Sequence, residues 1–223
     1  MTKPTARKAD LRDPTLEALI EAKNSIQIDA RASSPRRAEI VALSAVLFAE
    51  SGYQGTTIRD IAERADILSG SLYHHFESKE SIVDEIMRAY WSDLFDEYHR
   101  VLQADLDSAS QICEMIAISV RMLQQHGPAT RILLNDYPFV AAALPYIERL
   151  TSVIEWVWTD LLIEGARVGV LRSDLNPVLA YRNIMSAIAG TGRWFDPTGT
   201  ITVEQVVMEM QQTFMMGISV HAG

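Results

Sequence analysis

The stretch that most constrains this chain is residues 56–79, T-T-I-R-D-I-A-E-R-A-D-I-L-S-G-S-L-Y-H-H-F-E-S-K, which reads as two short helices joined by a tight turn. Thr57 is a good N-cap, and Asp60 follows three residues later, close to the pattern of a capping box. The apolar residues that come next share one helical face: Ile58, Ile61 and Ala62. Residues 65–68 break this pattern, which predicts a turn before a second helix.

The second helix of this stretch is predicted to begin with a small, polar turn. Ser69 is expected to cap it, and Gly70 and Ser71 are small enough to let its first turn approach another surface closely. Leu72 and Phe76, four residues apart, are expected to pack inward, whereas the outer side is expected to carry Tyr73, His74 and His75. Such a helix, braced by a shorter helix before it, has the geometry of a helix-turn-helix that enters the DNA major groove.

The same residues carry a family resemblance. S-G-S-L-Y-H-H-F-E-S-K-E resembles the end of the DNA-binding domain of TetR-type transcriptional regulators, and T-T-I-R-D-I-A-E-R-A resembles the preceding helix. The matching block runs from about Arg36 to Met87, and the rest of the chain resembles the family in length and helix pattern. The resemblance implies a three-helix helix-turn-helix DNA-binding domain at 35–80 and a larger helical effector-binding and dimerisation domain at 81–223. Residues 1–34 are polar and mixed in charge, so we expect a flexible N-terminal extension there.

Helical spacing continues through the chain, so we predict an all-α fold. Ser34 and Pro35 begin a helix that ends before Gly52, and a long helix is expected at 79–104 because no proline or glycine interrupts it. Spacing also favours a short helix within 14–28. Boundary prolines, glycines and caps predict the remaining helices at 108–126, 128–136, 145–169, 177–195 and 202–219. No β-type alternation of any length appears.

The charge of the chain is unusual for a DNA-binding protein. The formal net charge is −9; residues 1–88 hold 12 basic and 14 acidic side chains, and residues 89–223 hold 8 arginines against 15 acids. DNA affinity must therefore depend on where particular cations lie rather than on the overall field.

Several segments exclude other classes of protein. No apolar run of about 18 residues is present, so we expect no membrane association, and the N-terminus lacks the apolar core of a secretory signal. Cys113 is the single cysteine, which excludes an intrachain disulfide and suits a reducing cytoplasm. We expect Cys113 to pack as a small hydrophobic residue.

Predicted DNA contacts fall into two groups. Ser69, Gly70 and Ser71 are expected close to the bases, with Tyr73 and His74 reaching phosphates or base edges. The residues expected to orient the domain on the phosphate backbone are Arg36, Arg37, Thr57, Arg59 and Lys79. Four basic residues of the extension could also touch phosphates, although a solvated tail is the favoured interpretation: Lys3, Arg7, Lys8 and Arg12.

The last two predicted helices, 177–195 and 202–219, are so apolar that they need partners on more than one face. In the family the final helix pair packs against the same pair of a second protomer, so we predict a twofold homodimer. The two helices that begin at Ser69, one in each protomer, would then lie about one DNA turn (~34–36 Å) apart.

A small-molecule effector is expected in an apolar, aromatic-lined pocket among the middle helices, because family members usually bind ligands there. The candidate residues are Met115, Ile118, Met122, Tyr137, Phe139, Trp156, Arg193 and Trp194. For each residue singly, ordinary core packing is the alternative. Cations available for a carboxylate or phosphate are Arg121, Arg131, Arg182 and Arg193, each of which could equally form a surface salt bridge.

A finer resemblance concerns effector class. Together with the motif block, G-T-G-R-W-F-D-P near the end is similar to TetR-type repressors of cholesterol or steroid catabolism in actinobacteria. This resemblance implies a coenzyme A thioester as effector, with its acyl part in the apolar pocket and its phosphates near arginine.

The expected mechanism is repression relieved by ligand. Effector binding would shift the helix at 79–104 and change the separation of the two DNA-binding domains of the dimer. This change would lower affinity for a palindromic double-stranded operator. Two alternatives stay open, namely a transcriptional activator and a DNA-independent helical assembly protein with a degenerate helix-turn-helix.

Catalysis is not expected. The five histidines form no H-x-x-x-H or HExxH pattern, and no P-loop, G-x-G-x-x-G or G-x-S-x-G motif is present. We therefore predict no catalytic residue, no metal site and no cofactor.

Overall fold

A computed structural model describes residues 13–26 and 34–219, and within those ranges the fold is all-α, as predicted. The regular elements there are helices, with one isolated bridge between Leu171 and Ser219. The basic residues proposed as a phosphate-binding tail, Lys3, Arg7, Lys8 and Arg12, lie outside the described residues. No helix within the described ranges combines the length and apolarity that crossing a bilayer requires.

The described residues divide into two compact units, which we treat separately. The head unit comprises 23–26, 34–93 and 126–150, and the body unit comprises 13–22, 94–125 and 151–219. The head unit therefore contains α7 (Gly127–Ala143) as well as the predicted DNA-binding helices. α5 (Lys79–Gln103) begins in the head unit and ends in the body unit.

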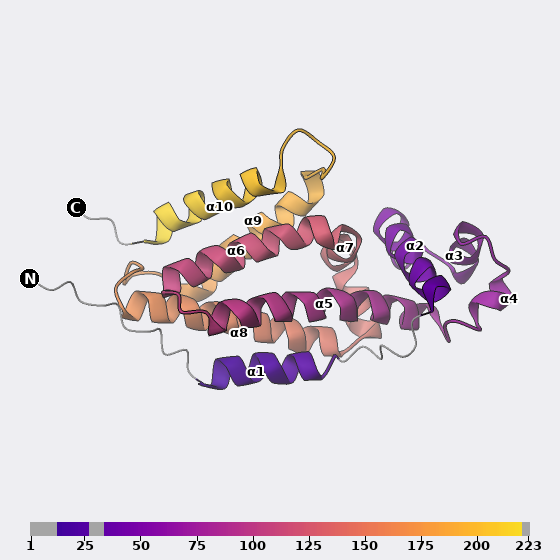
Figure 1. The fold of residues 1–223 in the computed structure, drawn as a ribbon, viewed down its shortest axis with the longest axis horizontal. Helices are drawn as coiled ribbons and strands as arrows, with labels where there is room; N and C mark the ends of the chain where they lie inside the picture. The colour runs from indigo at the N-terminus through magenta and orange to yellow at the C-terminus, as the bar shows by residue number, and fades with distance from the viewer. Residues whose placement is uncertain (1–12, 27–33, 220–223) are drawn as a thin grey trace, which may run out of the picture. The chain divides into compact units, whose positions relative to one another are not determined.

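The head unit contains α2 (Pro35–Ser51), α3 (Ile58–Arg64), α4 (Ser69–Leu72), the first part of α5, and α7 (Gly127–Ala143) (Figure 1). α2 begins as predicted: the Ser34 hydroxyl accepts a hydrogen bond from the Arg37 N–H at 3.2 Å, and Pro35 occupies the first turn. It ends at Gly52, whose φ of +79° is a conformation that favours glycine. α2 packs against both α3 and α7.

α3 begins with the predicted capping box. The Thr57 hydroxyl accepts from the Asp60 N–H at 3.2 Å, and the Asp60 carboxylate accepts from the Thr57 N–H at 2.7 Å. The turn after α3 passes through Asp66, whose φ of 54° is one that aspartate tolerates better than most residues.

The prediction that Ser69 caps α4 is wrong. Leu68 occupies the N-cap position with extended backbone, and no side chain caps the helix. Ser69 is instead the first helical residue, and regular α-helix ends at Leu72, followed by turns up to His75. The position at which α4 begins is therefore determined by the turn from Asp66 to Leu68 and by the burial of Leu72 and Phe76, which are 1% and 3% exposed.

The body unit is a bundle of longer helices: the end of α5, α6 (Ser108–Gln125), α9 (Pro177–Trp194), α10 (Val203–Ile218) and most of α8 (Tyr146–Arg167), whose first five residues belong to the head unit. α6 packs against α9 and more extensively against α10 (Figure 1). Its core includes a hydrogen-bonded trio in which the Trp158 ring N–H donates to the Tyr98 hydroxyl at 3.0 Å, and that hydroxyl meets Ser119 Oγ at 2.6 Å. Burial raises the pKa of Tyr98 to about 12.

Side-chain caps define both final helices. The Asn176 side chain accepts from the Leu179 N–H at 3.0 Å, and Thr202 forms a capping box with Gln205. α10 is also tied to α6, because Arg121 forms two 2.8 Å hydrogen bonds with Glu204.

The short helix predicted within 14–28 is present as α1 (Asp13–Asn24). Its Leu19 is 1% exposed and its Thr15 hydroxyl donates to Asp160 at 2.9 Å, so this part of the predicted extension is packed within the body unit. One expectation about helix extent needs correction. The helix expected at 128–136 continues through Pro138 to Ala143. The proline removes one helical hydrogen bond, but Val140 and Ala141 beyond it are buried, and this burial favours continuing the helix.

Candidate nucleic-acid interface

The reading turn, which we define as residues 68–74, presents its predicted DNA-contacting side outward. Ser69, Gly70 and His74 are exposed, Ser71 is partly exposed, and Tyr73 is 58% exposed. A Cβ atom added at Gly70 would meet no atom within 4 Å, so the fold itself does not require glycine there. The outer side of this turn is thus available for contact with another molecule.

Arg37, predicted to contact phosphate, is engaged inside the head unit. Its guanidinium donates to Glu85 at 2.9 Å and to the His75 carbonyl oxygen, and it lies 4.0 Å from the centroid of the Phe76 ring. The side chain is only 21% exposed. Arg37 therefore fixes the residues that directly follow the reading turn, His75 and Phe76, onto α2 and α5.

Lys79 has a similar internal role. Its ammonium donates to the carbonyl oxygens of Tyr53 and Thr56 at 2.9 and 3.1 Å, and it lies 4.5 Å from the Tyr53 ring centroid. The Tyr53 hydroxyl in turn donates to Glu80 at 3.2 Å. Burial, followed by the Glu80 charge, raises the pKa of Tyr53 well above its ordinary value. Lys79 thus holds the loop between α2 and α3 against the start of α5.

The remaining predicted backbone contacts are more accessible. Arg36 is 38% exposed, pairs with Glu39 at 2.6 Å and donates to the Ala65 carbonyl oxygen. Thr57 and Arg59 are exposed at the start of α3. Hydrogen bonds from Thr57 are the main cause that lowers the pKa of Asp60, with a smaller contribution from the Arg59 charge.

α7 contacts the DNA-binding helices through a carboxylate that the sequence analysis missed. Asp136 is 8% exposed and accepts a hydrogen bond from the Tyr53 N–H at 3.1 Å, just after the C-terminal end of α2. A Cβ atom at Gly52 would lie 3.7 Å from the same carboxylate. This buried contact joins α7 to the segment that Lys79 also holds.

The predicted effector residues are distributed over both units. In the body unit, Met115, Ile118 and Met122 are buried on α6, whereas Trp156 is 39% exposed, Trp194 is 58% exposed and Arg193 is exposed. Two others lie on α7 in the head unit: Tyr137 and Phe139, the latter 44% exposed. Arg121, considered as an anchor for an anionic effector, is instead paired with Glu204.

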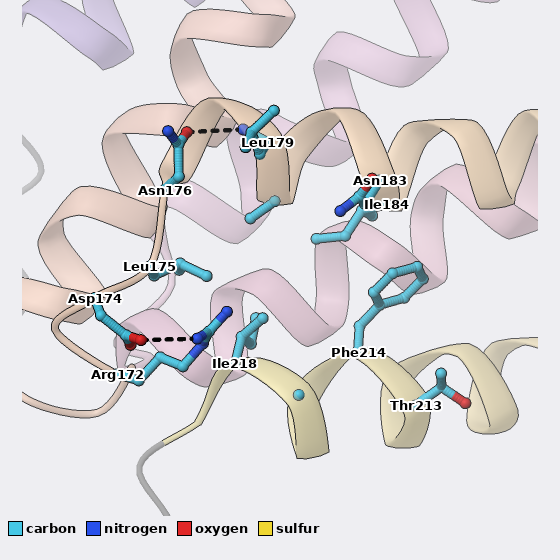
Figure 2. Close-up of a pocket in the computed structure, with 12 residues that line it drawn as sticks. Arg172, Asp174, Leu175, Asn176, Leu179, Asn183, Ile184, Thr213, Phe214 and Ile218 are labelled. Carbon is cyan, nitrogen blue, oxygen red and sulfur yellow. Dashed lines mark hydrogen bonds and ion pairs between the residues drawn. The ribbon is translucent and has the colours of Figure 1, made fainter.

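A pocket of about 460 Å³ lies in the body unit between the start of α9 and the end of α10 (Figure 2). Apolar side chains from both helices form part of its wall, including Ile184, Phe214 and Ile218. Asn183 and the Arg172–Asp174 pair, joined at 3.1 Å, supply polar groups at its margin. None of these residues was predicted to bind the effector, because the pocket combines two segments about 30 residues apart.

Other candidate chemistry is weak. Burial, with the nearby Glu114 and Asp107 charges, raises the pKa of Cys113, which disfavours the thiolate that a redox sensor would need. Within residues 13–26 and 34–219, no group of three or more His, Cys, Asp or Glu side chains is arranged to hold a metal ion.

Comparisons with known proteins agree with this architecture. Residues 40–86 match the family model of bacterial regulatory proteins, tetR family, and residues 105–218 match that of the tetracyclin repressor-like C-terminal domain. The HTH-type transcriptional repressor KstR2 of Rhodococcus jostii (strain RHA1) is 35% identical over 193 residues, covering 86% of this chain and 95% of that protein. KstR2 of Mycobacterium tuberculosis (strain ATCC 25618 / H37Rv) is 35% identical over 187 residues, covering 82% and 93%.

Solved structures share the fold over most of the chain. The ketosteroid transcriptional regulator KstR2 of M. tuberculosis has a TM-score of 0.81 at 33% identity, covering 87% of this chain and 98% of that one. AibR in complex with isovaleryl coenzyme A and operator DNA has a TM-score of 0.70 at 21% identity, covering 80% and 97%, and supports the fold alone. Two family models match this chain, and its relatives align over most of its length, so the chain belongs to the TetR family of bacterial regulatory proteins.

Proposed function

We propose that this protein is a ligand-responsive transcriptional repressor that acts in the cytoplasm, binds a palindromic operator as a homodimer and is released by a small apolar or acyl-CoA-type effector. The observation that carries the proposal is the exposed reading turn, in which Ser69, Gly70 and Tyr73 face outward while Leu72 and Phe76 anchor it. Relatives that are 35% identical over more than four fifths of this chain are named transcriptional repressors, which supports the same function.

The phosphate contacts are divided between two roles. Arg36, Thr57 and Arg59 are accessible enough to touch the DNA backbone directly. Arg37 and Lys79 are positioning residues, because their donors are directed to Glu85 and to backbone carbonyl oxygens of the head unit. A net charge of −9 is compatible with DNA binding when a dimer brings two such accessible sets to one duplex.

The occupant of the exposed faces of α9 and α10 would be a second copy of this chain. Large apolar side chains remain exposed on both helices, namely Val178, Leu179, Trp194, Met208 and Met216. Association of two identical faces would remove this surface from water, which is favourable by about 25 cal/mol per Å². A Leu179→Glu, Met208→Glu variant should sediment as a monomer, whereas a variant that still sediments as a dimer would argue against this interface.

For the effector, the pocket between α9 and α10 supports an apolar ligand with a polar or anionic end. Its volume of about 460 Å³ lies within the usual range for small-molecule sites. Arg172 could meet an anionic group by exchanging its partner Asp174. Similar proteins are described as a ketosteroid regulator and as a complex with isovaleryl coenzyme A, which supports screening acyl-CoA and steroid-derived acids.

Two physical connections could carry the effector signal. α5 is continuous from the body unit to the head unit, and α7 holds the end of α2 through Asp136. A coupling free energy of about 1–3 kcal/mol between effector and operator would change operator affinity about 5–150-fold.

The direct test is binding of the purified protein to DNA upstream of its own gene, followed by fluorescence anisotropy over a range of salt concentrations. We expect sequence-specific binding whose affinity falls with salt, and release by an acyl-CoA or steroid acid. Arg59→Ala should weaken binding to all sequences and reduce the salt slope by about 1. An Asn183→Trp variant should bind operator normally but lose its effector response if the pocket is the effector site.

One alternative has support from composition, namely a DNA-independent assembly protein. The acidic chain and the exposed apolar residues of α9 and α10 would suit it. This alternative predicts a dimer that shows only weak binding to any duplex, with equal affinity for upstream and unrelated DNA.

A transcriptional activator is the other alternative. A reporter assay in which deletion of the gene lowers, rather than raises, transcription would favour it.

A further inference from the structure

Leu68 is the most exposed large apolar side chain among residues 13–26 and 34–219, at 79%. A single exposed leucine is ordinary on a protein surface. Its location is unusual, because Leu68 immediately precedes the first turn of α4 and belongs to the reading turn.

The local structure does not explain leucine at this position. Leu68 is the N-cap residue of α4, with φ −70° and ψ 142°, and it leaves the helix without a side-chain cap. Serine, threonine, asparagine and aspartate are strongly preferred at N-caps because their oxygen atoms accept a backbone N–H. This chain uses such residues elsewhere, at Ser34, Thr57, Asn176 and Thr202. At α4 it carries a side chain that neither caps the helix nor enters the core.

The neighbours of Leu68 make one continuous outward surface. Ser69 and Gly70 are exposed, and the space around the position of a Gly70 Cβ is open. Tyr73 is exposed one turn later. If this surface docks against DNA, the Leu68 side chain is carried to the base edges along with the small residues beside it.

The chemistry of leucine limits what it can recognise there. Its side chain has no hydrogen-bond donor or acceptor, so it cannot read the polar edge of any base. In the major groove the apolar group that distinguishes one base is the C5-methyl of thymine. We infer that Leu68 contacts one thymine methyl group in each operator half-site and thereby selects a T·A pair at that position. This inference rests on the proposed function, since it requires operator binding by the reading turn.

Replacing thymine by deoxyuridine tests the inference, because this change deletes the methyl group and leaves the base-pairing edge intact. Once the operator is mapped, each thymine of a half-site is replaced singly, and affinities are measured by anisotropy for wild type and for Leu68→Ser. Serine removes the apolar contact and supplies the missing cap, so this variant should fold at least as well as wild type. Leu68→Met keeps an apolar side chain, and Val168→Ser removes an exposed apolar side chain from the body unit as a matched control.

For wild type we expect one thymine per half-site at which deoxyuridine weakens binding about fourfold, and about fifteenfold when both half-sites are changed, as one buried methyl group predicts. Leu68→Ser should bind the unmodified operator and the deoxyuridine-substituted operator with equal affinity. Leu68→Met and Val168→Ser should still bind the deoxyuridine-substituted operator more weakly.

Two outcomes would overturn the inference while leaving operator recognition intact. One is a wild-type protein that is insensitive to deoxyuridine at every position, and the other is a Leu68→Ser protein with an unchanged sensitivity profile. Failure of the wild-type protein to bind any specific DNA would overturn the proposed function together with the inference, so the two failures are distinguishable.

Discussion

The reading turn and the internal contacts behind it use their polar residues in opposite ways, although both belong to the head unit. We call these internal contacts the junction, and its residues are Arg37, Tyr53, Lys79, Glu80, Glu85 and Asp136. At the junction, Arg37 and Lys79 direct their donors to Glu85 and to backbone carbonyl oxygens, and Asp136 accepts from a buried backbone N–H. In the reading turn, Ser69 and Tyr73 are exposed. A cation close to a DNA-binding helix is therefore not necessarily a DNA contact.

This difference indicates a division of labour between rigidity and recognition. α4 is only four residues long and lacks a side-chain cap, so its own helical hydrogen bonds contribute little to holding it in place. Its orientation depends on buried Leu72 and Phe76 and on the Arg37 guanidinium, which contacts both Phe76 and the His75 carbonyl. Changes at the junction should reduce stability, and changes at the exposed residues of the reading turn should reduce DNA affinity alone.

The largest expected effect is that of Arg37→Ala. This change leaves the partly buried Glu85 carboxylate and the His75 carbonyl without their guanidinium partner, so we expect the free energy of unfolding to fall by about 3 kcal/mol. Urea denaturation followed by circular dichroism measures it. Arg59→Ala, which removes an exposed arginine of the same unit, should change stability by less than about 0.5 kcal/mol. If the two variants lost the same free energy of unfolding, the internal contacts of Arg37 would contribute no more to stability than an exposed arginine does.

Asp136→Ala should have the next largest effect on stability. The buried Tyr53 N–H would lose its acceptor, which is expected to reduce the free energy of unfolding by about 2 kcal/mol. Asp136→Asn keeps an acceptor oxygen and should lose less than half as much. If α7 also transmits the effector signal, the Asp136→Ala protein should release the operator less completely than wild type at saturating effector. An unchanged release would indicate that α5 alone couples effector binding to operator release.

Gly70→Ala should show the reverse pattern. The added methyl meets open space within the protein, and alanine favours helix, so stability should be unchanged or rise by up to about 1 kcal/mol. Against a duplex the methyl would obstruct close approach, and we expect operator affinity to fall about tenfold, or about 1.4 kcal/mol. Gly127→Ala, where the Cβ would also meet open space, is the matched control. Unchanged affinity of Gly70→Ala would place the DNA elsewhere.

The smallest effect concerns alkaline pH at the junction. Because burial and Glu80 raise the pKa of Tyr53 in the fold, its protonated form contributes stability that is complete below the unfolded pKa of about 10 and is lost as pH rises above it. Tyr98 and Tyr146, whose pKa values are also raised, add to this loss. Tyr53→Phe should therefore reduce the fall in stability between pH 10 and 11 by about 1 kcal/mol. An identical pH profile for the variant would show that Tyr53 ionises freely.

Local chemistry in the sequence predicted the features that depend on nearby residues. The capping box of Thr57 and Asp60, the caps at Ser34 and Asn176, and the inward pair Leu72 and Phe76 all follow from spacings of three or four residues. The exposed side of the reading turn followed from the same pattern.

What the sequence could not predict depends on partners far along the chain. Arg37 pairs with a glutamate 48 residues later, and Tyr53 with an aspartate 83 residues later, so neither contact is visible in a local pattern. The same holds for the pocket walls at Ile184 and Phe214. Ser69 was misassigned as a cap because the turn through Asp66 places Leu68 at the N-cap instead. The positions of arginine and lysine in the sequence therefore could not distinguish residues that contact phosphate from residues that stabilise the head unit.

The most direct test of the central claim is protection of guanine N7 atoms from methylation in the mapped operator, since N7 lies in the major groove. The account predicts two protected patches centred about one helical turn (~34–36 Å) apart, both present with wild type and Arg59→Ala and both weakened by Gly70→Ala. Protection confined to one patch, or two patches that Gly70→Ala leaves at full strength, would contradict insertion of the reading turn into DNA twice per dimer.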